Sequence, residues 1–330
     1  MEMPTSTLTG ITLKDMFDAG LHFGHQTKRW NPKMKGYIFD KRNGIHIIDL
    51  TQTVELLDQA AQFVKNVVLD GKKVLFVATK KQAAELVKGA AESVEQFYVT
   101  ERWLGGTLTN AKTIRSSVKR MRQLQATAKA NGGELSEHKQ EASMLRRELT
   151  KLETNLTGIA DMQELPGAVI VIDCVKEANA VKEAVRLHIP VIAIVDTNAD
   201  PEPIDYVIPG NDDSVRGIEL ILGGLTKVIK EAGEEYSAKA ADEAKKREAE
   251  RAARQDAEKA ARADRKAKAG AKPRSGAAKK PTVAANVKAA ARAAKEAAEI
   301  KAKADLAAKR QAKVAEVEAQ VAEAPATTEA

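Results

Sequence analysis

Two short stretches of the sequence gather side chains that could do chemistry. Residues 22–34 read HFGHQTKRWNPKM and hold two histidines, three cations, a tryptophan and an Asn-Pro turn. Residues 101–120 read ERWLGGTLTNAKTIRSSVKR and again place Arg, Trp, Gly, Thr and Asn before a run of cations. These residue types fit three kinds of site: a metal centre, a catalytic centre, or a surface that binds an acidic partner.

The metal hypothesis rests on His25, Asp196 and Asp213. Asp196 ends a predicted parallel strand and Asp213 follows in the turn PGNDD, and the carboxyl ends of such strands line the ligand crevice of open α/β sheets. Zinc or magnesium is the cation that such a pocket would take. The five histidines and one cysteine do not supply a structural zinc site. The simpler interpretation is that the acids cap the last helix while His25 hydrogen-bonds locally, with no cofactor.

The sequence lacks several common catalytic and phosphate-binding motifs. The sequence contains no G-x-G-x-x-G, no G-x-x-x-x-G-K-[ST] and no G-x-S-x-G, so neither a phosphate-binding loop nor a nucleophile elbow is present. We therefore predict no catalytic residue and no small-molecule substrate. A nucleotide- or sugar-phosphate-binding enzyme built on the same kind of sheet remains the alternative.

Both stretches have the composition of an RNA-binding surface. Lys and Arg neutralise phosphates, Asn and Thr donate to phosphate or sugar oxygens, Trp stacks on bases, and Gly lets the backbone approach closely. The predicted contacts are Lys28, Arg29, Trp30, Asn31, Lys33, Lys35, Arg102, Trp103, Gly105, Gly106, Thr107, Thr109, Asn110, Lys112, Arg115 and Lys119. The competing interpretation makes each tryptophan partly buried and the cation run a solvated helix face.

The elements that must position these residues read as a doubly wound α/β domain. Apolar, β-branched segments predict about five mainly parallel strands, at 73–79, 97–100, 168–173, 191–196 and 206–208. Helical segments are predicted at 53–71, 80–93, 176–188 and 210–233. Asn211 or Asp212 is the expected N-cap of the last helix. Strand–helix alternation of this kind is typical of an open sheet covered on both faces.

Residues 107–158 interrupt the alternation. Apolar positions recur at steps of three and four on both sides of a Gly-Gly turn, which predicts an antiparallel coiled-coil hairpin with arms of roughly 30 Å. The predicted organisation is then an RNA-binding body formed by 1–106 and 159–231, the inserted hairpin, and an Ala/Lys/Glu-rich tail at 232–330.

Charge and composition separate the tail from the rest. Residues 231–330 hold 23 Lys and Arg against 17 Asp and Glu, which accounts for +6 of the net charge of +7. The tail lacks large apolar residues, so we expect it to be disordered or partly helical. Its charge leaves a DNA-binding role as a further alternative. The single cysteine, Cys174, and the lack of a signal or membrane-spanning segment indicate a cytoplasmic protein.

Four stretches together resemble the bacterial small-subunit ribosomal protein S-two family. They are GLHFGHQTKRWNPKM, FVATKKQA, ERWLGGTLTN and VIAIVDTNADP with IDYVIPGNDDSVR, in order over residues 8–230. The resemblance implies a parallel α/β domain with a protruding coiled coil and no catalysis. It also implies a place in the cytoplasmic ribosome, binding to small-subunit ribosomal RNA between head and body, contact with neighbouring proteins, and recruitment of ribosomal protein S-one. Which residues touch RNA within each motif is a chemical hypothesis. Ala199 and the stretch DCVKEANA depart from the family pattern, and the tail is longer than is typical.

Overall fold

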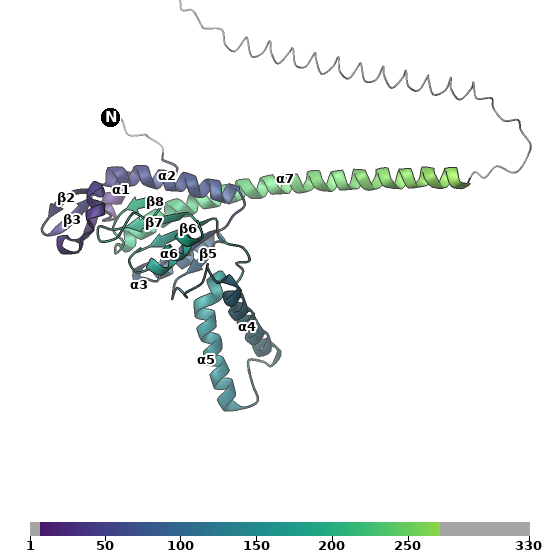
Figure 1. Ribbon diagram of the computed structural model, residues 1–330, viewed down its shortest axis with the longest axis horizontal. Helices are drawn as coiled ribbons and strands as arrows, with labels where there is room; N and C mark the ends of the chain where they lie inside the picture. The colour runs from purple at the N-terminus through teal and green to yellow at the C-terminus, as the bar shows by residue number, and fades with distance from the viewer. Residues whose placement is uncertain (1–6, 271–330) are drawn as a thin grey trace, which may run out of the picture. The chain divides into compact units, whose positions relative to one another are not determined.

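The computed structural model describes residues 7–270 of the chain (Figure 1). Residues up to Arg251 form one compact unit, and the fold below is that of this unit. Its centre is a five-stranded parallel sheet with the strand order β5-β4-β6-β7-β8. The strands are β4 (Val74–Val77), β5 (Phe97–Val99), β6 (Ala168–Ile172), β7 (Val191–Val195) and β8 (Tyr206–Pro209). Each coincides with a strand expected from the sequence, so the predicted fold class is confirmed.

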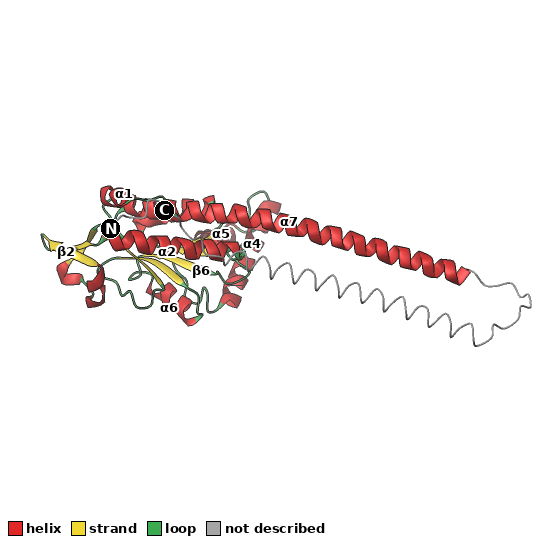
Figure 2. Cartoon of the chain, turned by 90° about the horizontal axis from the view of Figure 1, so that it is seen from above, coloured by secondary structure: helices red, strands yellow, loops and turns green. Residues whose placement is uncertain are grey.

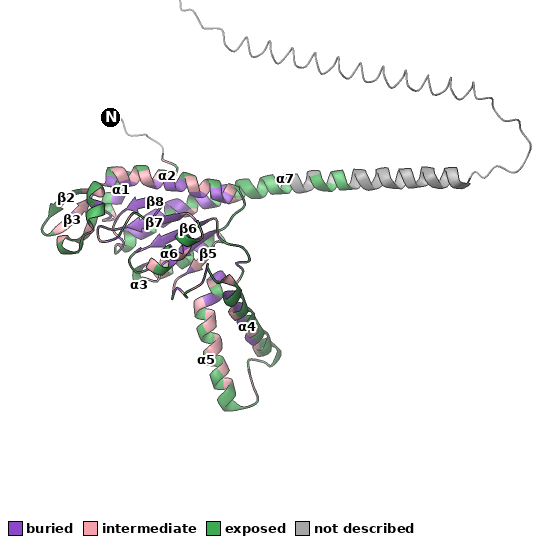
Figure 3. Ribbon diagram, viewed as in Figure 1, coloured by how far each residue is buried: buried purple, intermediate pink, exposed green. Residues whose placement is uncertain are grey.

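Helices cover both faces of this sheet (Figure 2). The helices on the first face are α2 (Leu50–Leu69), α3 (Lys81–Ser93) and the first part of α7 (Val215–Gly270). The second face is covered by α6 (Ala178–Arg186), the turn η3 (Thr157–Ile159) and the foot of α4 (Ala111–Ala130). The three central strands β4, β6 and β7 are buried at every residue, which explains their uninterrupted apolar sequences (Figure 3).

A second, antiparallel sheet was not expected. Its strands, in the order β1-β3-β2, are β1 (Phe23–Gln26), β2 (Ile38–Arg42) and β3 (Ile45–Ile48). The short helix α1 (Leu13–Asp18) and the 3-10 turns η1 (Thr27–Arg29) and η2 (Pro32–Tyr37) accompany it. The predicted Asn-Pro turn is present at the start of η2, whereas strand β1 within residues 22–34 was not predicted. Strands this short carry little periodicity, but the Asn43-Gly44 dipeptide between β2 and β3, with φ of 53° and 77°, is a hairpin signal that would have revealed them.

The inserted segment forms a helical hairpin. Helix α4 pairs with α5 (Lys139–Leu156), and Figure 1 shows them side by side. Gly132 and Gly133 turn the chain between them with positive φ angles of 64° and 102°. The α4 side of the seam buries Ile114, Val118, Met121 and Leu124, and the predicted leucines of α5 are buried or half-buried against it. The two predicted arms are thus confirmed.

Helix α7 differs from the predicted closing helix at both ends. The cap is Ser214, whose Oγ accepts the N–H of Gly217 at 3.3 Å. The expected caps have other partners: the Asn211 side chain accepts the N–H of Asp213, and Asp212 accepts a hydrogen bond from Lys80. The helix continues to Gly270, so the first part of the predicted tail is helical. The remainder, residues 271–330, lies outside the described residues.

Candidate nucleic-acid interface

A cluster of charges fills the carboxyl end of the parallel sheet, where open α/β folds bind ligands. Lys80, which follows β4, places its Nζ 2.9 Å from Asp212 Oδ1 and 2.7 Å from Asp213 Oδ1, both beyond β8. Asp173, after β6, lies 3.6 Å from the same nitrogen. The Lys80 side chain is only 14% exposed. The carboxyl end of the sheet therefore holds an internal cluster of one ammonium group and three carboxylates.

Burial and pairing determine the charge states in this cluster. Burial raises the pKa of Asp212 to about 6, although its hydrogen bond with Lys80 acts in the opposite direction. Burial by itself would lower the pKa of Lys80, but hydrogen bonds to Asp213 and Asp212 outweigh it and raise the pKa overall. Lys80 therefore stays protonated and offsets part of the negative charge of its three carboxylate neighbours.

His25 joins the small antiparallel sheet to the same cluster. Its backbone N–H donates to Asp196 Oδ1 at 3.2 Å and to Thr197 Oγ1 at 2.9 Å, and its Nδ1 lies 2.8 Å from Asp196 Oδ2. The hydrogen bond to Asp196 raises the pKa of His25. Gly24 permits this approach, because an added Cβ would lie 2.7 Å from the Thr197 Cγ2 atom. Strand β1 thus lies directly against the end of β7.

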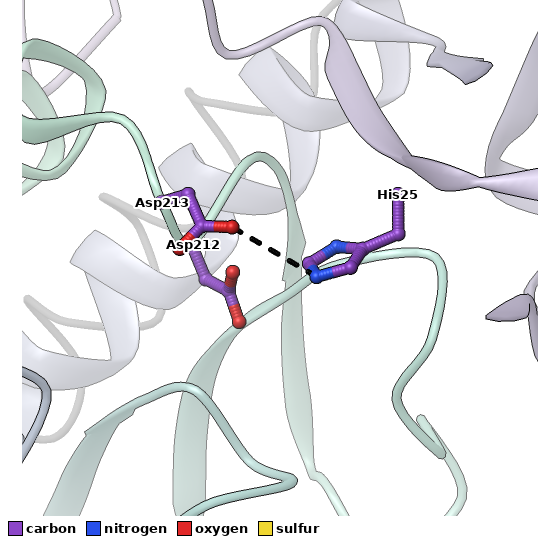
Figure 4. Close-up of side chains that lie close together, drawn as sticks. All are labelled: His25, Asp212 and Asp213. Atoms are coloured by element: carbon purple, nitrogen blue, oxygen red, sulfur yellow. Dashed lines mark ion pairs between the residues drawn. The ribbon is translucent and has the colours of Figure 1, made fainter.

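The predicted metal ligands do come together. His25 contacts Asp196 as described, and its Nε2 is 3.8 Å from Asp213 Oδ2 (Figure 4). The group whose ligand atoms all lie within 4.8 Å of one another contains Asp212 in place of Asp196. A divalent cation bound there would have to compete with the Lys80 ammonium for both carboxylates. The zinc or magnesium hypothesis stays a prediction, and the geometry favours the internal ion pairs.

The first predicted RNA-binding stretch is attached to the body of the protein by its backbone and by one buried side chain. Its backbone is fixed where the Asn31 N–H donates to the Thr197 carbonyl at 2.7 Å, and buried Met34 anchors η2. The Asn31 side chain caps η2 by accepting the Lys33 N–H. Lys33 itself pairs with Asp200, at 2.8 Å, and with Glu202, and these hydrogen bonds raise its pKa. Its charge is therefore neutralised within the protein.

Three cations of this stretch remain available. Lys28, Arg29 and Lys35 are exposed, and within residues 7–270 none of them forms an ion pair. Trp30 is 37% exposed and its ring lies 5.3 Å from that of the buried His46. The indole is thus partly held by the protein and partly exposed to solvent, and an exposed aromatic ring can stack on a base.

The second predicted stretch is organised by a residue that the sequence analysis missed, Glu183 of α6. One carboxylate oxygen accepts from Trp103 Nε1 at 3.0 Å and from the Gly106 N–H at 2.8 Å. The other accepts from the Leu108 N–H at 3.0 Å and from the N–H and hydroxyl of Thr109, each at 3.1 Å. Burial acts to raise the pKa of Glu183, but the hydrogen bond from Trp103 and the backbone N–H groups lower it overall.

These contacts give several predicted RNA-binding residues an internal role. Trp103 is buried, and Thr107 is buried with its hydroxyl donating to the Leu104 carbonyl at 2.6 Å. With Gly106 and Thr109 also bonded to Glu183, this loop supports the foot of α4. No local signal marked Glu183, because its partners lie 74 to 80 residues away in the chain.

Helix α4 carries the remaining predicted cations. Its 20 residues include six Lys or Arg and no Asp or Glu. Lys112, Arg115 and Lys119 are exposed and form no ion pair within residues 7–270. Arg120 pairs with Glu148 at 3.0 Å across the hairpin. Arg102, Gly105 and Asn110 are also exposed, beside the beginning of this helix.

Comparison with known proteins agrees with this arrangement. The family described as Ribosomal protein S2 matches residues 16–232. A small ribosomal subunit protein uS2 from Solibacter usitatus is 51% identical over 224 residues, which cover 68% of this chain and 74% of that protein. A uS2 protein from Corynebacterium efficiens is 52% identical over 225 residues, covering 68% and 80% respectively.

The match includes the parallel sheet, the helical hairpin and both basic stretches. Among the helices within residues 7–270, none has the length and apolar character needed to cross a membrane. Ribosomal protein S2 is a family of ribosomal proteins and not of enzymes. The resemblance seen in the sequence is confirmed: the chain belongs to the ribosomal protein S2 family.

Proposed function

We propose that this protein is a structural component of the small subunit of the cytoplasmic ribosome, where it binds ribosomal RNA through two basic surfaces. The observation that carries the proposal is helix α4, whose six cations have no acidic residue beside them on the helix. The second surface consists of Lys28, Arg29 and Lys35 around the exposed Trp30. Unpaired cations next to a stacking residue are the usual means of binding folded RNA.

The filled crevice supports a scaffold over an enzyme. A nucleotide- or sugar-phosphate-binding protein of this fold needs an open site at the carboxyl ends of its strands. Here Lys80 and His25 enter that region and are bonded to Asp212 and Asp196. The contact between His25 and Asp196 fastens the small sheet to the body, so the region serves to hold the first basic surface in position.

Neighbouring ribosomal proteins are the second class of partner. Phe17, Phe23 and Phe39, in α1, β1 and β2, are 56%, 47% and 75% exposed. Exposed aromatic side chains are enriched in protein–protein interfaces. We propose that these exposed aromatic side chains contact a neighbouring protein. Placement between head and body and recruitment of ribosomal protein S-one are proposed from family membership alone.

The RNA proposal is tested with a matched pair of triple variants. Lys112, Arg115 and Lys119 of α4 are changed to Gln in one protein, and the exposed cations Lys139, Arg146 and Lys151 of α5 in the other. Each cation that binds a phosphate contributes close to one ion to the salt dependence of binding. We expect the α4 variant to lower the slope of log K against log salt by about 2 to 3, and the α5 variant to lower it less.

Sedimentation of lysate at moderate salt supplies the second readout. Co-migration of the wild-type chain with small subunits is the expected result. A protein that stays in the soluble pool and is unaffected by added ribosomal RNA would refute the proposal. Preferential binding of duplex DNA over ribosomal RNA would instead support the alternative of a DNA-binding protein driven by the basic tail.

A further inference from the structure

A groove of about 670 Å³ lies between α4 and residues 159–165, which follow the hairpin. Its apolar walls come from Ile114 and Val118 of α4 and from Met162 and Leu165 opposite. The first three are at least nine-tenths buried, whereas Leu165 is 48% exposed at the opening. The volume falls within the range of about 300–1,000 Å³ that ligand pockets occupy.

Cations form the upper edge of this groove. Arg115, Lys119 and Arg122 all line it. The Arg115 guanidinium donates to the Gln163 carbonyl, and Arg122 donates to the Ala160 carbonyl at 3.0 Å and pairs with Asp161 at 2.5 Å. A carbonyl holds Arg115 in place without cancelling its charge, and Lys119 forms no ion pair within residues 7–270. An apolar floor therefore lies beside Arg115 and Lys119, neither of which forms an ion pair within residues 7–270, and Glu164 is the one acidic residue that lines the groove.

The same cations belong to a longer stripe along α4. Lys112, Arg115, Lys119, Arg122 and Lys129 follow one another at steps of three, four, three and seven residues, which places them on one side of the helix. At 1.5 Å per residue the stripe is about 25 Å long. The α4 residues that line the groove run from Ala111 to Ala126, so the stripe continues beyond one end of the groove, at Lys129. A chain with regularly spaced negative charges therefore matches it better than a short acidic peptide, which would pair only at the groove.

We infer that a strand of RNA follows this stripe and places one unpaired nucleotide in the groove. The base lies against Val118, Met162 and Leu165, while the flanking phosphates meet Arg115 and Lys119. Proteins take unpaired nucleotides of folded RNA into pockets, where the faces of the base contact aromatic or apolar side chains and the backbone phosphates contact cations. The inference rests on the proposed RNA-binding function and narrows it, because it assigns to the hairpin root an extruded nucleotide and not a duplex backbone.

Photo-crosslinking in assembled small subunits tests this directly. The photoreactive amino acid p-benzoylphenylalanine is placed at Leu165, and separately at Met144, which is 71% exposed on α5 and does not line the groove. After irradiation, crosslinked nucleotides are mapped by reverse-transcription stops on the ribosomal RNA. We expect position 165 to crosslink to a single unpaired nucleotide, and position 144 not to reach that nucleotide.

The other outcomes overturn the inference. A crosslink from position 165 to a protein would show that a neighbouring chain fills the groove. A crosslink only to base-paired RNA, or none at all, would show that no unpaired nucleotide enters it. Each of these results is obtained in subunits that contain the protein, so it leaves the RNA-binding function standing. If the proposed RNA-binding function itself were wrong, the protein would not be incorporated into small subunits, which is a different observation.

Binding measurements with the full chain and ribosomal RNA give an independent test. Leu165→Ala should weaken binding by about 3- to 10-fold, because it removes an apolar wall, and should leave the salt slope unchanged. Lys119→Gln should lower the slope by about one ion. Met144→Ala is the matched control and should change neither quantity. Equal affinities for Leu165→Ala and Met144→Ala, with both proteins folded by circular dichroism, would remove the groove from the RNA interface.

Discussion

Glu183 illustrates how a single side chain can organise a distant loop. Its carboxylate accepts five hydrogen bonds, from Trp103, Gly106, Leu108 and twice from Thr109. A charged acceptor makes these bonds stronger than neutral ones, and the donors of the buried Trp103 and Leu108 would otherwise lose their water on folding. The loop at the foot of α4 is therefore held from beneath by α6.

Glu183→Gln should destabilise the protein by about 1.5–3 kcal/mol, because the amide accepts fewer hydrogen bonds and brings its own N–H groups towards the donors. Denaturant unfolding followed by the fluorescence of Trp103, in a Trp30→Phe background, measures the change. The pKa of Glu183 is lowered in the folded state, so its stabilisation is present above its ordinary pKa and is lost as pH falls through the folded-state value. The variant should lack this acid-dependent component. Parallel stability curves for the two proteins below pH 5 would contradict the assignment.

Lys80 is the second residue whose removal should be costly. Lys80→Met leaves the carboxylates of Asp212 and Asp173 without their cation, and breaking such a buried arrangement costs about 3–5 kcal/mol. Urea unfolding at pH 7 measures this cost. Lys81→Met, at the exposed neighbouring position, should change stability by less than about 0.5 kcal/mol.

The stability lost in Lys80→Met should depend on pH in a defined direction. Burial raises the pKa of Asp212 to about 6, and loss of the ammonium removes an interaction that lowers it. A carboxyl group with a folded-state pKa above its unfolded value stabilises the fold at low pH and loses that contribution as pH rises through the folded value. The stability deficit of the variant should therefore shrink between pH 7 and pH 5. A deficit that grows on acidification would contradict the described pairing.

At the scale of elements, glycine decides how closely two segments approach. Gly158 lies in η3, where the hairpin meets the parallel sheet, and an added Cβ would overlap the carbonyl oxygen of Tyr98 in the neighbouring β5. A backbone atom cannot turn away as a flexible side chain can. The hairpin root and strand β5 can therefore lie this close only with glycine at that position.

Gly158→Ala should destabilise the protein by about 1–3 kcal/mol, because the root of the hairpin must move away from β5. Thermal or urea unfolding measures the loss. Gly89→Ala in α3 is the control: apart from its chain neighbours and the nearby backbone of α3, no atom lies within 4 Å of its added Cβ, so the substitution should stabilise the helix by about 0.5–1 kcal/mol. Similar effects of the two substitutions would show that the close contact at Gly158 does not exist.

For the whole molecule, the uneven distribution of charge matters more than its total. Residues 1–230 carry a net charge of only +1, yet α4 by itself carries +6. The body can therefore bind an anionic partner through one helix while its other surfaces remain balanced. The C-terminal residues add charge of their own, since residues 241–330 hold 22 Lys and Arg against 14 Asp and Glu, a net charge of +8.

A chain that ends at Ala240 should separate these contributions. Glu235 pairs with Lys65 at 3.3 Å and Tyr236 lies against Gly71, so the cut after residue 240 keeps these two contacts as well as the buried first part of α7. We expect its unfolding free energy to change by less than about 0.5 kcal/mol. Incorporation into small subunits should persist, and the salt slope of RNA binding should fall. An unchanged slope would exclude residues 241–330 from the RNA interface.

The sequence by itself determined the parallel sheet, its covering helices, the hairpin and the family. These features depend on local periodicity and on four ordered motifs, such as the uninterrupted apolar runs of β6 and β7. It also supplied both basic stretches, including Lys28, Arg29 and the cations of α4, because charge is a property of composition. The small sheet was not predicted because its strands of four or five residues carry little periodicity.

Only the tertiary structure decided which of those residues remain available to a partner. It neutralised Lys33 with Asp200 and Glu202, attached Trp103 and Thr109 to Glu183, and filled the end of the sheet with Lys80 and His25. These pairings join residues 74 to 171 positions apart, so no local pattern encodes them. Desolvation and hydrogen bonding act between neighbours in space, and the fold is what makes these residues neighbours.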